Sequence, residues 1–173
     1  MNDSGTPKPK RRWYQFSLRA LFGLMTVVAM FCAWFGYQRR EGQRAKAAIE
    51  ELGGRVSIWD YWDHRWGQAI NADLFGTAID DQDLARIVEL PISGALRLDG
   101  TAITDEGLAH VQKRRDLRSL SISDTDITDE GLEHLKQASS LEFLQAHRTR
   151  ITDGGVAELK RALPKLKVYY GAP

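Results

Sequence analysis

The stretch TAITDEGL at residues 101–108 is followed 24 residues later by TDITDEGL at 125–132. Related copies, TAIDDQDL and TRITDGGV, occupy residues 77–84 and 149–156 at the same spacing. Chance matches do not keep a constant spacing over four copies, so the sequence predicts a chain of similar structural units. The copies begin at Thr77, Thr101, Thr125 and Thr149.

The residues before each of these threonines predict a short strand. Leu120 and Ile122 lie two residues apart, and Leu144 and Ala146 repeat this alternation one unit later. Such an alternation buries one face of a strand. A single unit has too little apolar surface to fold alone, so we expect the leucines of successive strands to stack, each contributing about 1.5–3 kcal/mol. These leucines are Leu96, Leu120 and Leu144.

The residues after each threonine predict a short helix. Leu108 and Val111 lie three residues apart, as on one face of a helix. Acidic pairs at 105–106 and 129–130 occupy the first turn, where the helix dipole stabilises negative charge by about 0.3–1 kcal/mol. Residues that favour the N-cap position precede these helices. They are Asp80, Thr104, Thr128 and Thr152.

The unit of strand, turn and helix resembles a leucine-rich repeat, in the variant whose turn reads Thr-x-Ile-Thr-Asp-x-Gly-Leu. The repeated threonines stand where that family commonly has Asn or Cys. The resemblance implies an α/β solenoid over residues 69–173, with about four 24-residue units, parallel strands on a concave side and helices on a convex side. The segment LPKLKVYY at 163–170 fits the period only with one inserted residue, so we expect an atypical terminal unit that caps the solenoid.

An apolar segment near the start of the chain predicts a transmembrane helix. Residues 20–37 contain no charged side chain, and as a helix they span about 27 Å, close to the thickness of the bilayer core. Tryptophan and tyrosine residues flank both ends, as in aromatic belts. We therefore expect a single membrane-spanning helix over 18–38, in contact with lipid, after a basic leader at 1–17.

Other interpretations of this segment fit the residues less well. A signal peptide cleaved after Val27-Val28-Ala29 would leave the apolar MFCAWFGY as the new terminus. A lipoprotein anchor at Cys32 needs a small preceding residue, and Phe31 stands there. RRWYQF carries the paired arginines of a twin-arginine signal without the rest of that motif. An uncleaved anchor fits best.

Charge is distributed unevenly along the chain. Of 24 Lys and Arg residues, nine lie in residues 1–46, together with two of the 23 Asp and Glu residues, so this part has net charge +7 and the rest −6. A slight excess of positive charge before the apolar segment favours a non-cytoplasmic repeat domain. The basic end suits anionic lipid headgroups, whereas the acidic remainder argues against nucleic acid as a partner.

The whole chain resembles a family of membrane-anchored bacterial leucine-rich-repeat proteins. The likeness rests on WYQFSLR in the leader, one apolar helix, AIEELGGRV after it and then the repeats. Most of that family has no assigned biochemical activity. The resemblance implies a single-pass protein of the bacterial inner membrane and says more about architecture than about purpose.

Residues 39–68 are expected to form a juxtamembrane helix and an N-terminal cap. Gly53-Gly54 should end the helix. The aromatic segment RVSIWDYWDHRW at 55–66 then follows, and we interpret Ile58, Trp59 and Trp62 as a cover for the first repeat. Alternatively, Trp59, Trp62 and Trp66 lie against the bilayer or form a ligand patch. One face of the expected helix carries Ala45, Ala48, Ile49 and Leu52.

The sequence contains no pattern that predicts catalysis, a cofactor or a metal site. Asp60, Asp63 and His64 match no established ligand spacing, and the 24-residue repeat accounts for His110 and His134. A nucleophile elbow, a phosphate-binding loop and a Cys/His cluster are all missing. We therefore expect neither enzyme activity nor a bound cofactor.

The outward-facing strand positions are the candidate binding residues. Solenoids commonly bind proteins or peptides on such a face, which predicts a membrane-anchored interaction module. The alternative is an ordinary solvated surface on a structural spacer or envelope component. One column of these residues consists of Asp73, Arg97, Ser121 and Gln145, and the next of Phe75, Asp99, Ser123 and His147.

Overall fold

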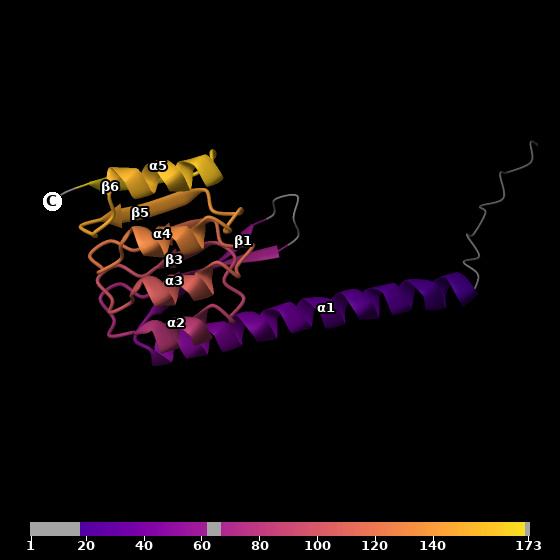
Figure 1. The fold of residues 1–173 in the computed structure, drawn as a ribbon. Helices are drawn as coiled ribbons and strands as arrows, with labels where there is room; N and C mark the ends of the chain where they lie inside the picture. Colours follow the sequence, from indigo (N-terminus) through magenta and orange to yellow (C-terminus); the bar gives the residue numbers. More distant parts are fainter. Residues whose placement is uncertain (1–17, 62–66, 172–173) are drawn as a thin grey trace, which may run out of the picture. The chain divides into compact units, whose positions relative to one another are not determined.

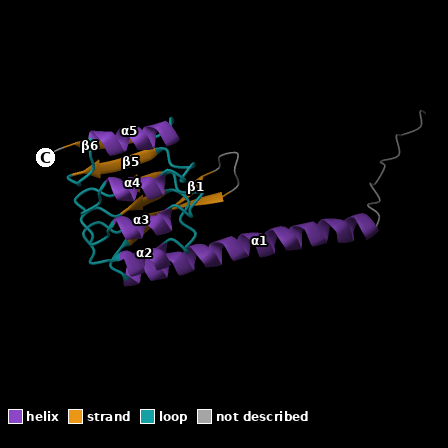
Figure 2. Ribbon diagram, viewed as in Figure 1, coloured by secondary structure: helices purple, strands orange, loops and turns teal. Residues whose placement is uncertain are grey.

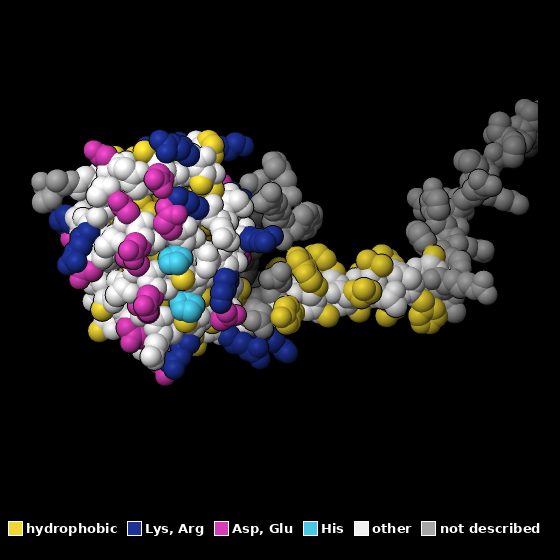
Figure 3. Space-filling model, in the orientation of Figure 1, with side chains coloured by type: hydrophobic (Ala, Val, Ile, Leu, Met, Phe, Trp, Pro, Cys, Tyr) yellow, Lys and Arg dark blue, Asp and Glu magenta, His cyan; other side chains and the backbone are white. Residues whose placement is uncertain are grey.

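A computed structural model describes residues 18–61 and 67–171, and the chain divides into two compact units, Met1–Gln38 and Arg39–Pro173. Helix α1 spans Leu18–Glu51. Among the described residues, its segment Ala20–Glu51 is the one helix long and apolar enough to cross a membrane, a test of length and composition that a signal sequence near the N-terminus also meets. In the first unit, the large apolar side chains of this helix are exposed (Figure 3).

The last turns of α1 belong to the second unit and end as the sequence predicts. Ala45 and Ile49 are fully buried in the core. The N–H of Gly53 donates to the carbonyl of Glu50 at 3.0 Å, and that of Gly54 to the carbonyl of Ile49 at 2.9 Å. This is the Schellman arrangement, and it requires the left-handed conformation that Gly53 adopts with φ 79°.

The second unit contains one six-stranded sheet whose strand order follows chain order (Figures 1 and 2). The first two strands are antiparallel, and every later strand is parallel to the one before it. Four helices alternate with the later strands, and Figure 1 shows them along one face of the sheet. The strands are β1 (Arg55–Tyr61), β2 (Gly67–Asp73), β3 (Ala95–Arg97), β4 (Ser119–Ser121), β5 (Phe143–His147) and β6 (Lys167–Gly171). The helices are α2 (Asp81–Ile87), α3 (Asp105–Val111), α4 (Asp129–Leu135) and α5 (Asp153–Ala162).

The core repeats once per unit, which makes this an α/β repeat fold. Leu96, Leu120 and Leu144 are paired in register on adjacent strands, and each is at most 2% exposed. The helices close the core from the other side with two buried apolar side chains each, such as Leu108 and Val111 of α3. The stacked leucines and the helix positions predicted from the repeat period are therefore confirmed.

The terminal unit corrects one sequence-based prediction. Val168 of β6 pairs with Leu144 of β5, so the strand register keeps the period of the earlier units and contains no insertion. Only the buried leucine before the strand is shifted. Lys165 is exposed at the position equivalent to Leu141, and the next residue, Leu166, is buried in its place.

The N-terminal edge of the sheet is a hairpin that the repeat pattern does not predict. The aromatic segment forms strand β1, which pairs with β2 from Arg55 opposite Asp73 to Tyr61 opposite Gly67. The sheet therefore continues one antiparallel strand beyond the first repeat. The side chains of Ile58, Trp59 and Asp60 and residues 62–66 lie outside the described residues, and with them the predicted tryptophan cover and the rejected metal ligands.

A carboxylate at the start of α2, α3 and α4 connects each of these units to the next. Asp105 accepts the backbone N–H of Thr128 at 2.8 Å and its hydroxyl at 2.6 Å. Asp81 binds Thr104 in the same way, and Asp129 repeats the arrangement one unit later. Thr104 makes no side-chain cap bond to its own helix. The acidic residues thus join neighbouring units in addition to their expected place at the helix dipole.

This connection explains the glycine of the Thr-Asp-x-Gly motif. A Cβ added at Gly155 would overlap the Asp129 carboxylate, and Gly107 and Gly131 face the preceding aspartates in the same way. The first repeat has no preceding aspartate, and it carries Asp83 at the glycine position. Glycine is therefore required where a carboxylate from the preceding unit must pass.

Arg114 holds the connection between α2 and β3. Its guanidinium donates to the carbonyls of Val88 at 2.8 Å and Leu90 at 2.7 Å, and also to the carbonyl of Ile92. The same group pairs with Asp116 at 2.8 Å. One largely buried side chain thus donates to three backbone carbonyls of the loop between α2 and β3.

Candidate functional site

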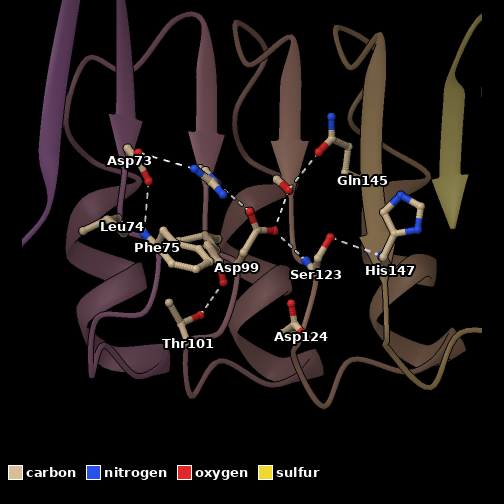
Figure 4. Close-up of polar contacts among 12 residues, drawn as sticks. Asp73, Leu74, Phe75, Asp99, Thr101, Ser123, Asp124, Gln145 and His147 are labelled. Atoms are coloured by element: carbon tan, nitrogen blue, oxygen red, sulfur yellow. Dashed lines mark hydrogen bonds and ion pairs between the residues drawn. The ribbon is translucent and has the colours of Figure 1, made fainter. Parts of the chain in front are cut away.

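The eight residues predicted from the outward strand positions lie together on the face of the sheet opposite the helices, called here the open face (Figure 4). The register places Asp73 beside Arg97, Ser121 beside Arg97 on the next strand, and Gln145 beside Ser121. The second column follows the same 24-residue offset from unit to unit, and its member Asp99 bonds to Arg97 and Ser121 of the first column. The predicted columns are therefore real neighbours in space.

Asp99 is the centre of this network. Its carboxylate accepts the Ser121 hydroxyl at 2.5 Å, the Ser123 N–H at 2.7 Å and the Arg97 guanidinium at 2.7 Å. The side chain is only 8% exposed, and three donors together compensate the burial of its charge. The hydrogen bond to Asp99 raises the pKa of the Arg97 guanidinium above its ordinary value.

Arg97 links the centre to the exposed part of the face. Its guanidinium lies 4.6 Å from the centre of the Phe75 ring and 3.7 Å from the Asp73 carboxylate. A cation held over an aromatic ring in this way contributes about 0.5–1 kcal/mol at an exposed site. Phe75, which is 58% exposed, is therefore held on the surface by Arg97.

Three of the eight residues that the sequence predicts as binding residues are not exposed to a partner. Asp99, Ser121 and Ser123 are buried, because they bond to one another beneath the longer side chains. Gln145 and His147 are exposed, as is Phe75. The site residues therefore divide into a buried hydrogen-bonded layer and an exposed layer that can contact a ligand.

The open face extends further than the predicted columns. Tyr169 pairs with Gln145 and adds a half-exposed aromatic ring to the first column. Phe143 and Lys167 form a third column beside it, with the Lys167 ammonium 5.3 Å from the Phe143 ring centre. Counting one repeat period onward from Gln145 would have found Tyr169, but the expected one-residue insertion hid this relation.

A turn with a left-handed residue follows the open face in every repeat. Gly76 and Gly100 have φ near +65°, and Asp124 and Arg148 adopt the same conformation with φ 57° and 53°. Non-glycine residues are uncommon there. The side chains of Asp124 and Arg148 form a bidentate ion pair, which lowers the pKa of the Asp124 carboxyl.

The helical face has a different character. Acidic side chains gather over the helices in Figure 3, and they include Glu106 and Glu130 in the first turns of α3 and α4. His110 and His134 occupy the last turns of the same helices. Because these positions recur once per unit, the repeat itself accounts for them.

Comparison with known proteins supports the nature of the repeat. Residues 115–136, which contain β4 and α4, match the family model described as Leucine Rich repeat. The match supports a leucine-rich-repeat protein, a class whose domains commonly bind other proteins. No curated protein matches the chain.

Proposed function

We propose that this chain is a membrane-anchored interaction module in which a leucine-rich-repeat solenoid binds a protein or peptide through its open face. The leucine-rich-repeat match and the exposed aromatic and amide side chains around Gln145 support this proposal. Exposed Tyr and Phe side chains are enriched in protein-binding surfaces. Neither catalysis nor a cofactor forms part of the proposal.

A photo-crosslinking amino acid at position 145 tests the assignment. In cells, we expect the full chain with the crosslinker at Gln145 to form a discrete adduct with one partner, because this side chain is exposed on the open face beside Tyr169. The same amino acid at Gln137, exposed just after α4, is the matched control. Equal adducts at both positions, or none at position 145, would remove the open face as the binding surface.

The matched substitutions Gln145→Arg and Gln137→Arg provide a second readout. We expect Gln145→Arg to weaken the crosslinked complex about tenfold, since an added charge in a contact surface costs about 1–2 kcal/mol or more. Gln137→Arg should leave it unchanged. Recovery of the complex by co-precipitation, with crosslinking placed at Tyr169, measures both variants.

The membrane anchor is a separate part of the proposal. The helical segment Ala20–Glu51, which contains an 18-residue window apolar enough to cross a membrane, supports it, as does the basic leader. We propose that residues 18–38 span the bacterial inner membrane once and that the repeat domain lies on the non-cytoplasmic side. Deletion of residues 13–37 should move the protein from the membrane pellet to the soluble fraction. A full-length chain that a carbonate wash releases from membranes would contradict a spanning helix.

A second candidate function is a structural spacer without a ligand. The hydrogen bonds that bury Asp99, Ser121 and Ser123 favour it, because a satisfied polar layer needs no partner. The crosslinking experiment separates the two functions, since a spacer gives no adduct from the open face.

A further inference from the structure

A groove lies at the edge of the open face where the loops between units lead into strands β4, β5 and β6. It has a volume of about 440 Å³. Phe143 and Lys167, which belong to the open face, form one wall, so the groove is continuous with the proposed binding surface. Its volume falls in the range of sites that hold a short peptide segment or a small ligand.

The groove is positively charged, in a domain that is otherwise acidic. Four cationic and two acidic side chains line it. Each acidic side chain already has an arginine partner, Asp116 with Arg114 at 2.8 Å and Glu142 with Arg118 at 3.4 Å. The cationic side chains are Arg115, Arg118, Lys165 and Lys167.

Two of these cations have no partner within the described part of the chain. Arg115 and Lys165 are exposed, and neither forms a hydrogen bond or ion pair there. Two carboxylates of a ligand in the groove would compensate both charges.

We propose that the partner of the open face carries an acidic peptide segment, and that this segment lies in the groove between Arg115 and Lys165. This inference rests on the proposed function and adds the chemistry of the ligand. A short peptide segment fits better than a nucleic acid, because its few carboxylates contact only the cationic groove. An extended polyanion would also meet the rest of residues 47–173, which have net charge −6. The exposed Phe143 ring at the groove wall provides an apolar contact for a residue beside the acidic ones.

Fluorescence polarisation on the full chain in mild detergent tests the inference. The probe is a fluorescein-labelled peptide rich in Glu with one Leu, and the comparison is the same peptide with every Glu replaced by Gln. We expect the Glu peptide to bind and the Gln peptide not to bind. Binding should weaken as salt is raised, because the contacts are charged and partly exposed.

Matched double substitutions locate the binding. The double substitution Arg115→Glu with Lys165→Glu should reduce the affinity for the Glu peptide about tenfold, because two exposed ion pairs are lost and two repulsive contacts replace them. Lys160→Glu with Arg161→Glu, on exposed positions of α5 outside the groove, changes charge equally and should have little effect. Equal weakening by both pairs would show a diffuse charge effect and overturn the proposal.

Two further outcomes would also overturn it. One is that glycerophosphoserine, a soluble lipid headgroup, or a uridine oligonucleotide binds more tightly than the Glu peptide and that this binding depends on Arg115 and Lys165. The other is no binding of the Glu peptide at low salt. If the Glu peptide fails while the adduct at position 145 persists, only the acidic-segment inference falls. If the peptide binds but no adduct forms, the proposed function falls instead.

Discussion

Leu120→Asp should unfold the repeat domain. Leu120 is fully buried and stacks between Leu96 and Leu144, so the variant places a carboxylate between two neighbouring units. The lost burial costs about 1.5–3 kcal/mol, and an unpaired buried charge adds about 3–5 kcal/mol. The sum is comparable to the whole free energy of unfolding of an ordinary domain, about 5–15 kcal/mol.

Urea unfolding of the full chain in detergent, followed by circular dichroism, measures this effect. At room temperature we expect the parent to unfold in one cooperative transition and the variant to lack this transition. Leu120→Met, which nearly conserves volume, is the matched control and should cost less than about 1.5 kcal/mol. If Leu120→Asp unfolds at the same urea concentration as the parent, the stacking described here does not support the domain.

Gly155→Ala should destabilise the last repeat by about 3 kcal/mol, the upper end of the contribution of one hydrogen bond to a charged group. The three atoms nearest to the added methyl group all belong to Asp129, and the side chain cannot move away without losing its two hydrogen bonds to Thr152. The loss exceeds the gain of about 1 kcal/mol from helix propensity.

The adjacent glycine supplies the control. A Cβ at Gly154 meets only the Thr152 hydroxyl, at 3.4 Å, so Gly154→Ala should be neutral or slightly stabilising. In an Asp129→Ala background, Gly155→Ala should cost little, because the obstructing carboxylate is gone. Urea unfolding of the parent, of Asp129→Ala, of Gly155→Ala and of the double variant gives the coupling energy between the two positions. Additive effects of Asp129→Ala and Gly155→Ala would show that the glycine serves another purpose.

The repeat period was sufficient to predict most of the fold. Its constant spacing places Leu96, Leu120 and Leu144 in one stack, and the same arithmetic predicts which outward residues are neighbours. Both results depend only on residues that recur at equal intervals. The sequence could not reveal the hairpin of β1 with β2, because its pairing is not repeated elsewhere and its side chains do not alternate simply.

The sequence predicts where the candidate residues lie on the sheet, but it does not predict which of their side chains are buried. The outward direction of Asp99 follows from strand geometry, and it applies equally to Gln145. Hydrogen bonds from Arg97 and Ser121 hold Asp99 in the buried layer whereas Gln145 is exposed, and strand geometry alone does not predict this difference. Similarly, a helix N-terminus was a sufficient local reason for Asp105, so its bond to Thr128 in the next unit was missed.

The bonds from Asp81, Asp105 and Asp129 each reach one unit forward and no further. A duplicated copy of one whole repeat, inserted between two interior units, would therefore bring its own threonine donor, its own aspartate acceptor and the glycine that leaves room for the carboxylate. The neighbouring units would need no compensating change. The length of such a protein can grow or shrink by gene duplication and deletion in whole modules, while a partial module would leave one aspartate facing a side chain that has no room for it.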